Sequence, residues 1–239
     1  MSISFYIKNK KKFFGYEKVM KVREVIDLFK EYKLSFYNID FHSNDPNGEK
    51  FYNTSIENWQ ENHSCILFGV EGKSGRGFEF SYNTTKNSYV IREFTPATEN
   101  DWLIALKFMQ VLSEKLNSKI ISEQGNIFTF ETINTFDYKS DIKLGIKVIS
   151  DILNKENEKG FNVDNIYGIK RVVSFNKEII EKIVNSSDEI KEFSKFCEDI
   201  QYIDAYSAKQ SFVEDTITKE KWGYYVLTEN LRTVLPYKP

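Results

Sequence analysis

Apolar and polar residues alternate from Ser88 to Phe94, and directly afterwards the apolar residues take up a helical spacing. The alternation predicts a strand with one buried face. The helical spacing predicts a helix over 98–117 with one face in a core, formed by Trp102, Ala105, Leu106, Met109, Leu112 and Leu116. Thr98 and Asp101 have the spacing of a helix start, in which the hydroxyl caps a backbone N–H and the acid lies at the positive end of the helix. This stretch predicts how part of the chain folds, and it contains no chemical motif.

Residues 65–94 predict a three-stranded antiparallel meander, because two turn signals divide them into three short runs with aromatic alternation. The side-chain period of two fixes the register, since a slip of one residue would move every apolar side chain to the other face. In this register the aromatic residues share the core side, and an acid meets an arginine on the other side. The predicted pairs are Tyr82 with Tyr89, Phe80 with Ile91, Glu79 with Arg92, Phe68 with Phe80, and Ile66 with Tyr82.

The remaining segments show weaker patterns of the same two kinds. They predict strands over 2–7 and 166–175, hairpins over 120–130 and near 203–213 with 222–228, and helices over 22–29, 142–153, 177–185 and 188–200, the last two capped by Asn176 and Ser186. A polar segment around Gly160 predicts a boundary between an N-terminal part (1–157) and a smaller C-terminal part (164–239), packed together as one unit. The chain is therefore predicted to be α+β, with antiparallel sheets covered by amphipathic helices.

Size and composition are those of a globular protein with a large core, since 41% of the 239 residues are apolar and 20 are Phe. The 33 basic and 35 acidic residues give a formal net charge of −2, which offers no global field to attract nucleic acid or an anionic membrane. The lysine run at residues 8–12 predicts an exposed loop. Because no secretion signal and no run of about 18 apolar residues is found, we expect a cytoplasmic protein without a membrane partner.

Two loops partly match ligand-binding motifs. Residues 69–77 contain Gly-Lys-Ser, but a phosphate loop requires a glycine where this chain has Leu67, and a helix where it predicts a strand. Residues 43–48 match part of a calcium loop, but Thr54 stands where the bidentate glutamate is required. We therefore expect a glycine-rich hairpin loop and a turn.

Histidine and cysteine are too sparse to predict a metal centre. His42 and His63 are the only histidines, and no metal-ligand spacing is present. Cys65 lies two residues from His63, so the two would share a strand face as a Cys/His nucleophile pair. Both Cys65 and Cys197 lie among apolar residues, which favours buried thiols instead. We expect no metal and no cofactor.

The candidate binding residues are polar and form two sets: Glu79, Arg92 and Glu93, and then Asp204, Tyr206 and Gln210, with Gln201 nearby. The first set lies on the predicted meander, and its alternative explanation is a surface ion pair that contributes little. The second set is predicted to share one strand face that a pocket or a sheet edge could use. No catalytic residue is predicted, because the acids are scattered and form no compact pair.

Three segments together resemble an uncharacterised bacterial family. They are the run Arg92-Glu93-Phe94-Thr95-Pro96-Ala97-Thr98-x-x-Asp101-Trp102, the segment Gln201-x-x-Asp204-Ala205-Tyr206 and the closing Leu235-Pro236-x-Lys238-Pro239. The family is a domain of unknown function of similar length, found in low-GC bacteria. The resemblance implies a single architecture over nearly the whole chain, and it supplies no activity, partner or catalytic residue.

These observations favour a cytoplasmic, non-catalytic protein of the immunity or accessory type that binds another bacterial protein, because aromatic residues beyond the needs of a core would form an interface. Two alternatives stay open: an enzyme whose site is assembled from dispersed residues, and a small-ligand or nucleic-acid binder that uses Lys8 to Lys12. A deep pocket with convergent titratable groups would favour the enzyme, and a flat exposed aromatic patch would favour the protein partner.

Overall fold

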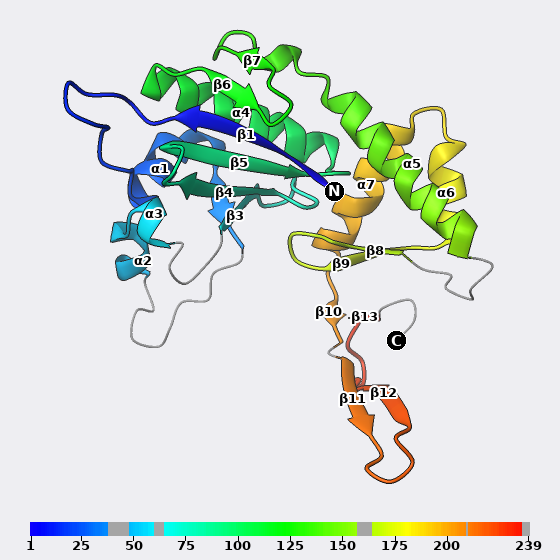
Figure 1. Cartoon of the computed structure of the whole chain (residues 1–239). Coiled ribbons are helices and arrows are strands. Elements are labelled where there is room, and N and C mark those ends of the chain that lie inside the picture. The colour runs from blue at the N-terminus through cyan, green and yellow to red at the C-terminus, as the bar shows by residue number, and fades with distance from the viewer. Residues whose placement is uncertain (38–47, 60–64, 157–163, 209, 236–239) are drawn as a thin grey trace.

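A seven-stranded antiparallel sheet forms the centre of the protein, with the strand order β2-β3-β4-β5-β1-β6-β7 (Figure 1). The computed structural model describes residues 1–37, 48–59, 65–156, 164–208 and 210–235. The strands of the sheet are β1 (Ser2–Lys8), β2 (Leu34–Phe36), β3 (Ile66–Val70), β4 (Phe78–Asn83), β5 (Ser88–Phe94), β6 (Ile120–Ser122) and β7 (Ile127–Phe128). The N-terminal strand therefore lies inside the sheet, between β5 and β6.

One long helix, α4 (Glu99–Leu116), packs along one face of this sheet. The other helices are α1 (Val22–Leu28), η1 (Lys30–Tyr32), α2 (Glu49–Asn53), α3 (Ile56–Trp59), η2 (Ile133–Thr135), α5 (Tyr138–Glu156), α6 (Lys177–Val184) and α7 (Glu189–Tyr202). In Figure 1, α5, α6 and α7 lie together beside the sheet. The predicted α+β class, with an antiparallel sheet covered by helices, is confirmed.

Three two-stranded sheets lie outside the main sheet in the described part of the chain. They are β8 (Asp164–Tyr167) with β9 (Val172–Phe175), β10 (Tyr206–Ser207) with β13 (Thr233–Val234), and β11 (Gln210–Glu214) with β12 (Lys221–Tyr225). The pair β10–β13 is parallel and the other two are antiparallel. The predicted hairpin near the C-terminus is confirmed in part as β11–β12, because the first half of its predicted first arm belongs to β10, which pairs with β13 instead.

The predicted start of α4 is confirmed. Thr98 is the N-cap residue, and its Oγ1 accepts a hydrogen bond from the backbone N of Asp101 at 3.2 Å. The Asp101 carboxylate accepts in return from the backbone N of Thr98 at 3.2 Å. The helix ends at Leu116, because Asn117 takes the left-handed conformation, with φ of 47°.

The predicted meander is confirmed over β3, β4 and β5, and so are the pairs Tyr82 with Tyr89, Phe80 with Ile91, and Glu79 with Arg92. The register of β3 is different, because Phe68 pairs with Phe78 and Ile66 with Phe80, each two residues from the predicted partner. Gly77 has φ of +70°, and a Cβ there would lie 2.3 Å from the Phe68 carbonyl oxygen. Only glycine allows this close turn into β4. A shift of two residues keeps every side chain on its predicted face.

Two local predictions in the C-terminal part are wrong. Residues 166–175 form a hairpin rather than one strand, because the backbone N of Gly168 donates to the Arg171 carbonyl at 3.0 Å and closes a turn. Helix α7 begins after Asp188, whose carboxylate caps it, and not after Ser186. The Ser186 hydroxyl donates instead to a carbonyl in the last turn of α6 at 2.8 Å.

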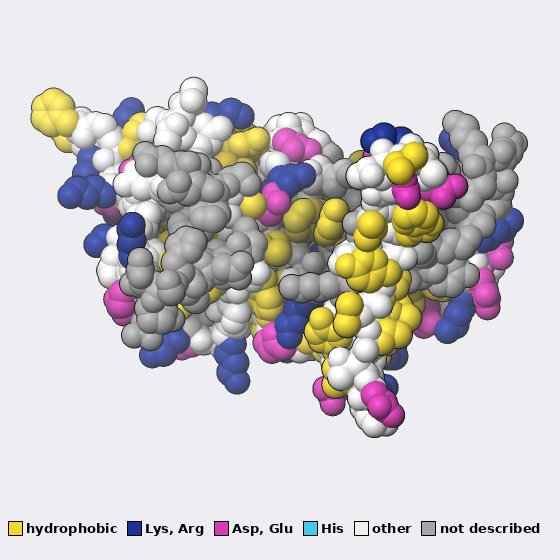
Figure 2. Space-filling view, turned by 90° about the horizontal axis from the view of Figure 1, so that it is seen from below, with side chains coloured by type: hydrophobic (Ala, Val, Ile, Leu, Met, Phe, Trp, Pro, Cys, Tyr) yellow, Lys and Arg dark blue, Asp and Glu magenta, His cyan; other side chains and the backbone are white. Residues whose placement is uncertain are grey.

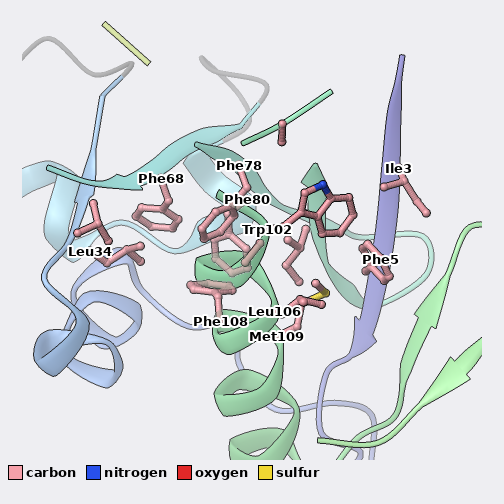
Figure 3. Packing of buried hydrophobic residues seen from close by; sticks show 14 of the residues in the cluster. Ile3, Phe5, Leu34, Phe68, Phe78, Phe80, Trp102, Leu106, Phe108 and Met109 are labelled. Atoms are coloured by element: carbon pink, nitrogen blue, oxygen red, sulfur yellow. The ribbon is translucent and has the colours of Figure 1, made fainter. Parts of the chain in front are cut away.

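The hydrophobic core lies between α4 and the sheet. Figure 3 shows the Phe108 ring of α4 beside the aromatic residues of β3 and β4. Its centroid lies 5.0 Å from those of Phe78 and Phe80, and 4.2 Å from that of Phe29 at the end of α1. The same cluster of buried side chains continues to Phe175 in β9, so it includes residues of both predicted parts.

Several predictions concern residues that the structure does not describe. They are the turn at 43–47, the pairing of His63 with Cys65, of which only Cys65 is described, and the boundary around Gly160. Within the described residues, no helix combines the length and the apolar character needed to cross a membrane.

Candidate functional site

The carboxylate of Asp101 organises the start of α4. It is fully buried, and its Oδ1 accepts a hydrogen bond from the backbone N of Gly77 at 2.9 Å. Its Oδ2 accepts from the backbone N of Arg76 at 2.8 Å and from the Thr98 hydroxyl at 2.8 Å. The helix N-terminus thus holds the glycine-rich loop that precedes β4, which the sequence predicted as a hairpin loop. Because protein donors surround this carboxylate, its role is structural.

Arg76 carries a buried positive charge between the two parts of the chain. Its guanidinium donates from Nε to the Tyr167 carbonyl at 2.8 Å and from Nη1 to the Pro96 carbonyl at 2.6 Å. Its Cζ lies 4.5 Å from the centre of the Phe94 ring, which adds a cation–π contact. Burial lowers the pKa of Arg76, and the negative charge of Asp101 opposes this effect. The side chain ties the loop before β4 to β8.

Glu93, one of the predicted binding residues, lies on the core side of β5. It is fully buried, opposite Phe78 and Ile3 on the neighbouring strands. Its Oε2 accepts a hydrogen bond from the backbone N of Phe94 at 3.2 Å, and its Oε1 has no hydrogen-bond partner among the described residues. Burial raises the pKa of Glu93 well above its ordinary value, and the charge of Asp101 raises it further. Burial therefore favours the neutral form of this carboxyl more than water does.

We expect Glu93→Gln to be more stable than the wild type at neutral pH, by roughly 1–3 kcal/mol. The unfolded chain releases the proton of Glu93 near the ordinary pKa, whereas the folded protein holds it to higher pH. The free energy of unfolding of the wild type therefore falls as pH rises between these two pKa values. Glutamine does not titrate, so the variant lacks this fall. Urea unfolding across the pH range measures the difference, which should vanish below about pH 4.3.

Glu114→Gln is the matched control, because Glu114 lies on the exposed side of α4. Its free energy of unfolding should follow the wild-type pH profile. If Glu93→Gln were less stable than the wild type at neutral pH, Glu93 would be charged in the folded protein, and Arg76 would be its counter-ion.

The predicted contact between Glu79 and Arg92 is confirmed. The two side chains form an ion pair across β4 and β5, on the face of the sheet opposite Glu93. Arg92 also donates from Nε to the Ser2 hydroxyl at 2.9 Å. Both side chains are partly exposed, and an exposed pair contributes at most about 1 kcal/mol. The structure therefore brings two members of the first set together and places the third in the core.

The second set of predicted binding residues is also divided. Asp204 lies in a bend after α7, Tyr206 in β10 and Gln210 at the start of β11. Because β10 pairs with β13 and β11 with β12, the expectation of one shared strand face is wrong. The chain changes direction here because α7 continues through Tyr202, and the carbonyls that follow it bind Arg171.

Arg171 was not among the residues predicted from the sequence. Its side chain holds the segment that follows α7 in place, where the chain leaves the helices and the main sheet. From the turn between β8 and β9, its guanidinium donates to the carbonyls of Ile203 at 2.9 Å and Ala205 at 2.6 Å. It also donates to the Ser207 hydroxyl at 2.8 Å. The Gln201 side chain accepts in turn from the backbone N of Arg171 at 2.8 Å. Its one signal in the sequence is that arginine is rare in this chain.

The chain beyond α7 forms an arm that extends away from the body (Figure 1). We define the arm as residues 203–235, of which the structure describes all but 209. Of the 21 exposed large apolar side chains on the described surface, ten lie in the arm. They are Ile203, Tyr206, Val213, Ile217, Trp222, Tyr224, Val226, Leu227, Leu231 and Leu235. Figure 2, seen from below, shows apolar side chains gathered where the arm projects toward the viewer.

The hairpin β11–β12 within the arm has one apolar face. Val213 lies opposite Trp222, and Tyr224 follows two residues later on the same face. These three side chains are each about half exposed, at 47%, 50% and 48%. At the end of the hairpin, Glu214 forms ion pairs with two lysines at 3.5 Å and 3.6 Å. An apolar centre with charges at its border is typical of a protein-binding surface.

The described residues do not group three His, Cys, Asp or Glu side chains in a way that could hold a metal. Cys197 is buried, as predicted, whereas Cys65, which was also predicted to be buried, is partly exposed. Burial raises the pKa of the Cys197 thiol well above the ordinary value. A groove of about 590 Å³ beside α4 is lined largely by apolar and lysine side chains. Of its acids, Glu71 is already bound by the Tyr37 hydroxyl at 2.9 Å and by Lys170. The arm is therefore the part of the described surface where exposed large apolar side chains are most concentrated.

We compared the chain with family models, curated proteins and solved structures. No curated protein matches the chain, and no solved structure matches it. The model of the family described as Domain of unknown function (DUF4299) matches residues 2–239. The chain therefore belongs to this family of unknown function.

Proposed function

We propose that this chain is a non-catalytic accessory protein that assembles through its C-terminal arm. The observation that carries the proposal is the concentration of exposed apolar side chains in the arm, whose strands do not join the main sheet. Monomeric proteins rarely expose a large contiguous apolar surface, and such surfaces mark interaction sites. Trp222 and Tyr224 add the aromatic side chains that are enriched at the centres of protein interfaces.

The root of the arm is suited to presenting this surface in one direction. Arg171 binds backbone carbonyls on both sides of the point where α7 ends, together with the Ser207 hydroxyl. These bonds hold the first residues of the arm against the β8–β9 turn. A segment that is already ordered loses less conformational entropy on binding, which favours association.

The partner that we propose is a second copy of this chain. A two-stranded hairpin alone is marginally stable in water, and the face of Val213 and Trp222 is uncovered here. A twofold axis would place the same apolar face of two copies together, as in most homodimers. The arm contains five acids and four bases, so like charges do not keep two arms apart. An interface of the usual size buries about 800 Å² on each partner, and the ten exposed large apolar side chains of the arm are the surface available for it.

Light scattering after size-exclusion chromatography tests this proposal. We expect the full-length protein to show twice its chain mass of 28.2 kDa at micromolar concentration. The triple variant Val213→Thr, Trp222→Thr and Tyr224→Thr removes most of the apolar face, while threonine keeps a high strand propensity. We expect this variant to dimerise at least about 30-fold more weakly, as loss of a central interface residue does.

Ile127→Thr is the matched control, because Ile127 is an exposed strand residue of β7, at the far edge of the main sheet. This variant should keep the wild-type mass. A monomeric wild type, or equal dissociation constants for the triple variant and the control, would show that the arm does not mediate assembly. Circular dichroism verifies that each variant is folded.

A further inference from the structure

The loop between β1 and α1 carries two exposed phenylalanines at its tip. We call residues 8–18 the basic loop. Phe13 is 94% exposed and Phe14 is 86% exposed, and their rings meet edge to face with centroids 4.8 Å apart. Figure 1 shows the chain between β1 and α1 projecting from the body. Because neither ring belongs to the buried cluster, packing of the core does not explain why phenylalanine stands at these positions.

The basic loop has a defined shape. The backbone N of Lys12 donates to the Gly15 carbonyl at 2.9 Å, and Gly15 has φ of +77°, as a tight turn of this kind requires. At the base of the loop, the buried side chain of Asn9 donates to the Glu17 carbonyl at 2.6 Å. The two rings therefore lie at the tip of a small, hydrogen-bonded hairpin.

Positive charge surrounds this tip. The basic loop contains one acid, Glu17, and five exposed lysines: Lys8, Lys10, Lys11, Lys12 and Lys18. In the described part of the chain, Glu17 forms an ion pair with Lys10 at 3.8 Å, and the other four lysines have no such partner. The formal net charge of the whole chain is −2, so the loop is a local excess of positive charge on a slightly acidic protein. The expectation of no membrane partner relied on the whole-chain charge and on the absence of a spanning apolar run, and neither of these describes a local basic surface.

We propose that the basic loop binds the surface of an anionic lipid bilayer by inserting Phe13 and Phe14 among the headgroups. Aromatic side chains favour the membrane–water interface, where their apolar surface leaves water. Lysines next to the inserted rings are attracted to the negative surface, and their long aliphatic stems let the ammonium groups reach the phosphates. The apolar tip and its basic surroundings thus match the two properties of such a surface.

A lipid surface fits the geometry better than a single-stranded nucleic acid does. Proteins that bind single strands offer a groove for the backbone and open aromatic faces on which bases stack. Here the rings of Phe13 and Phe14 meet each other at an interplanar angle of 84°, at the tip of a projecting loop. A projecting tip suits insertion between lipids better than it suits a strand that lies along a groove.

Sedimentation of the full-length protein with vesicles tests the proposal. We expect binding to vesicles of phosphatidylcholine with phosphatidylglycerol, and little binding to phosphatidylcholine alone. Raising the salt concentration should weaken binding, because the Debye length falls from about 10 Å at 0.1 M to about 3 Å at 1 M. Phe13→Ser with Phe14→Ser should lower the partition coefficient at least about tenfold. Lys11→Gln with Lys12→Gln should lower it about tenfold as well.

Substitutions on α5 supply matched controls. Leu144→Ser removes a similarly apolar exposed side chain, and Lys147→Gln with Lys155→Gln removes two exposed lysines. These variants should bind vesicles as the wild type does. Absence of binding to the anionic vesicles, or an equal loss in the controls, would overturn the proposal. Phenylalanine-dependent binding to a single-stranded oligonucleotide in place of vesicles would overturn it in favour of nucleic acid.

Discussion

Replacing Asp101 with alanine is expected to lower the free energy of unfolding by roughly 3–5 kcal/mol. The substitution leaves the backbone N–H groups of Arg76 and Gly77 buried without their acceptor. It also removes half of the capping box with Thr98, and a negative charge that acts on the buried Arg76 guanidinium. Urea unfolding followed by circular dichroism measures the loss.

Asp101→Asn separates the loss of charge from the loss of side-chain volume. Asparagine keeps one acceptor oxygen but turns an NH₂ group toward backbone N–H donors, so we expect a loss of roughly 2–3 kcal/mol. Glu114→Ala on the exposed side of the same helix is the control, and it should change the free energy of unfolding by less than about 0.5 kcal/mol. A loss below about 1 kcal/mol for Asp101→Ala would contradict the central role of this carboxylate.

The sequence predicted only the local half of this buried site. The contact between Thr98 and Asp101 could be predicted because a capping box is a motif of four consecutive residues. The hydrogen bonds from the backbone N–H groups of Arg76 and Gly77 to Asp101 could not be predicted. They join a loop to a helix across separations of 25 and 24 residues along the chain. A hydrophobic pattern shows which residues of a segment are buried, and it does not show which other segment covers them.

The same distinction applies to the main sheet. The register between β4 and β5 was predictable, because a short turn joins the two strands and the period of two allows one register. The position of β1 between β5 and β6 was not predictable, since Ser2 pairs with Phe94 far along the chain. Alternation in residues 2–7 predicted the strand without its partners. Non-local pairing of this kind has no signature in a single sequence.

The sequence also could not show which aromatic side chains are exposed and which are buried. The large number of aromatic residues predicted an interface, and the structure exposes aromatic side chains in the arm and in the basic loop while it buries those of the meander. Alternation could have placed Glu93 in the core, because it is two residues from Ile91 on the same face of β5. Whether the face of Trp222 is covered by another layer depends on the tertiary structure, which local patterns do not contain.

Phe108→Ala is expected to lower the free energy of unfolding by roughly 3–5 kcal/mol. The Phe108 ring is buried between α4 and the sheet, stacked on Phe29 and within 5.0 Å of the ring centres of Phe78 and Phe80. Alanine would leave a cavity among side chains from three elements, and the surrounding aromatic rings would relax only partly into it. Chemical unfolding monitored by circular dichroism gives the change.

Phe108→Leu shows how much of this loss comes from the aromatic ring rather than from burial. Leucine refills much of the volume but cannot reproduce the ring contacts. We therefore expect Phe108→Leu to lower the free energy of unfolding by roughly 1–2 kcal/mol, less than Phe108→Ala does. Leu103→Ala is the control on the same helix, because Leu103 is 48% exposed, and it should cost less than about 1 kcal/mol. If Phe108→Ala cost no more than Leu103→Ala, α4 would not be held to the sheet by the aromatic cluster that Figure 3 shows.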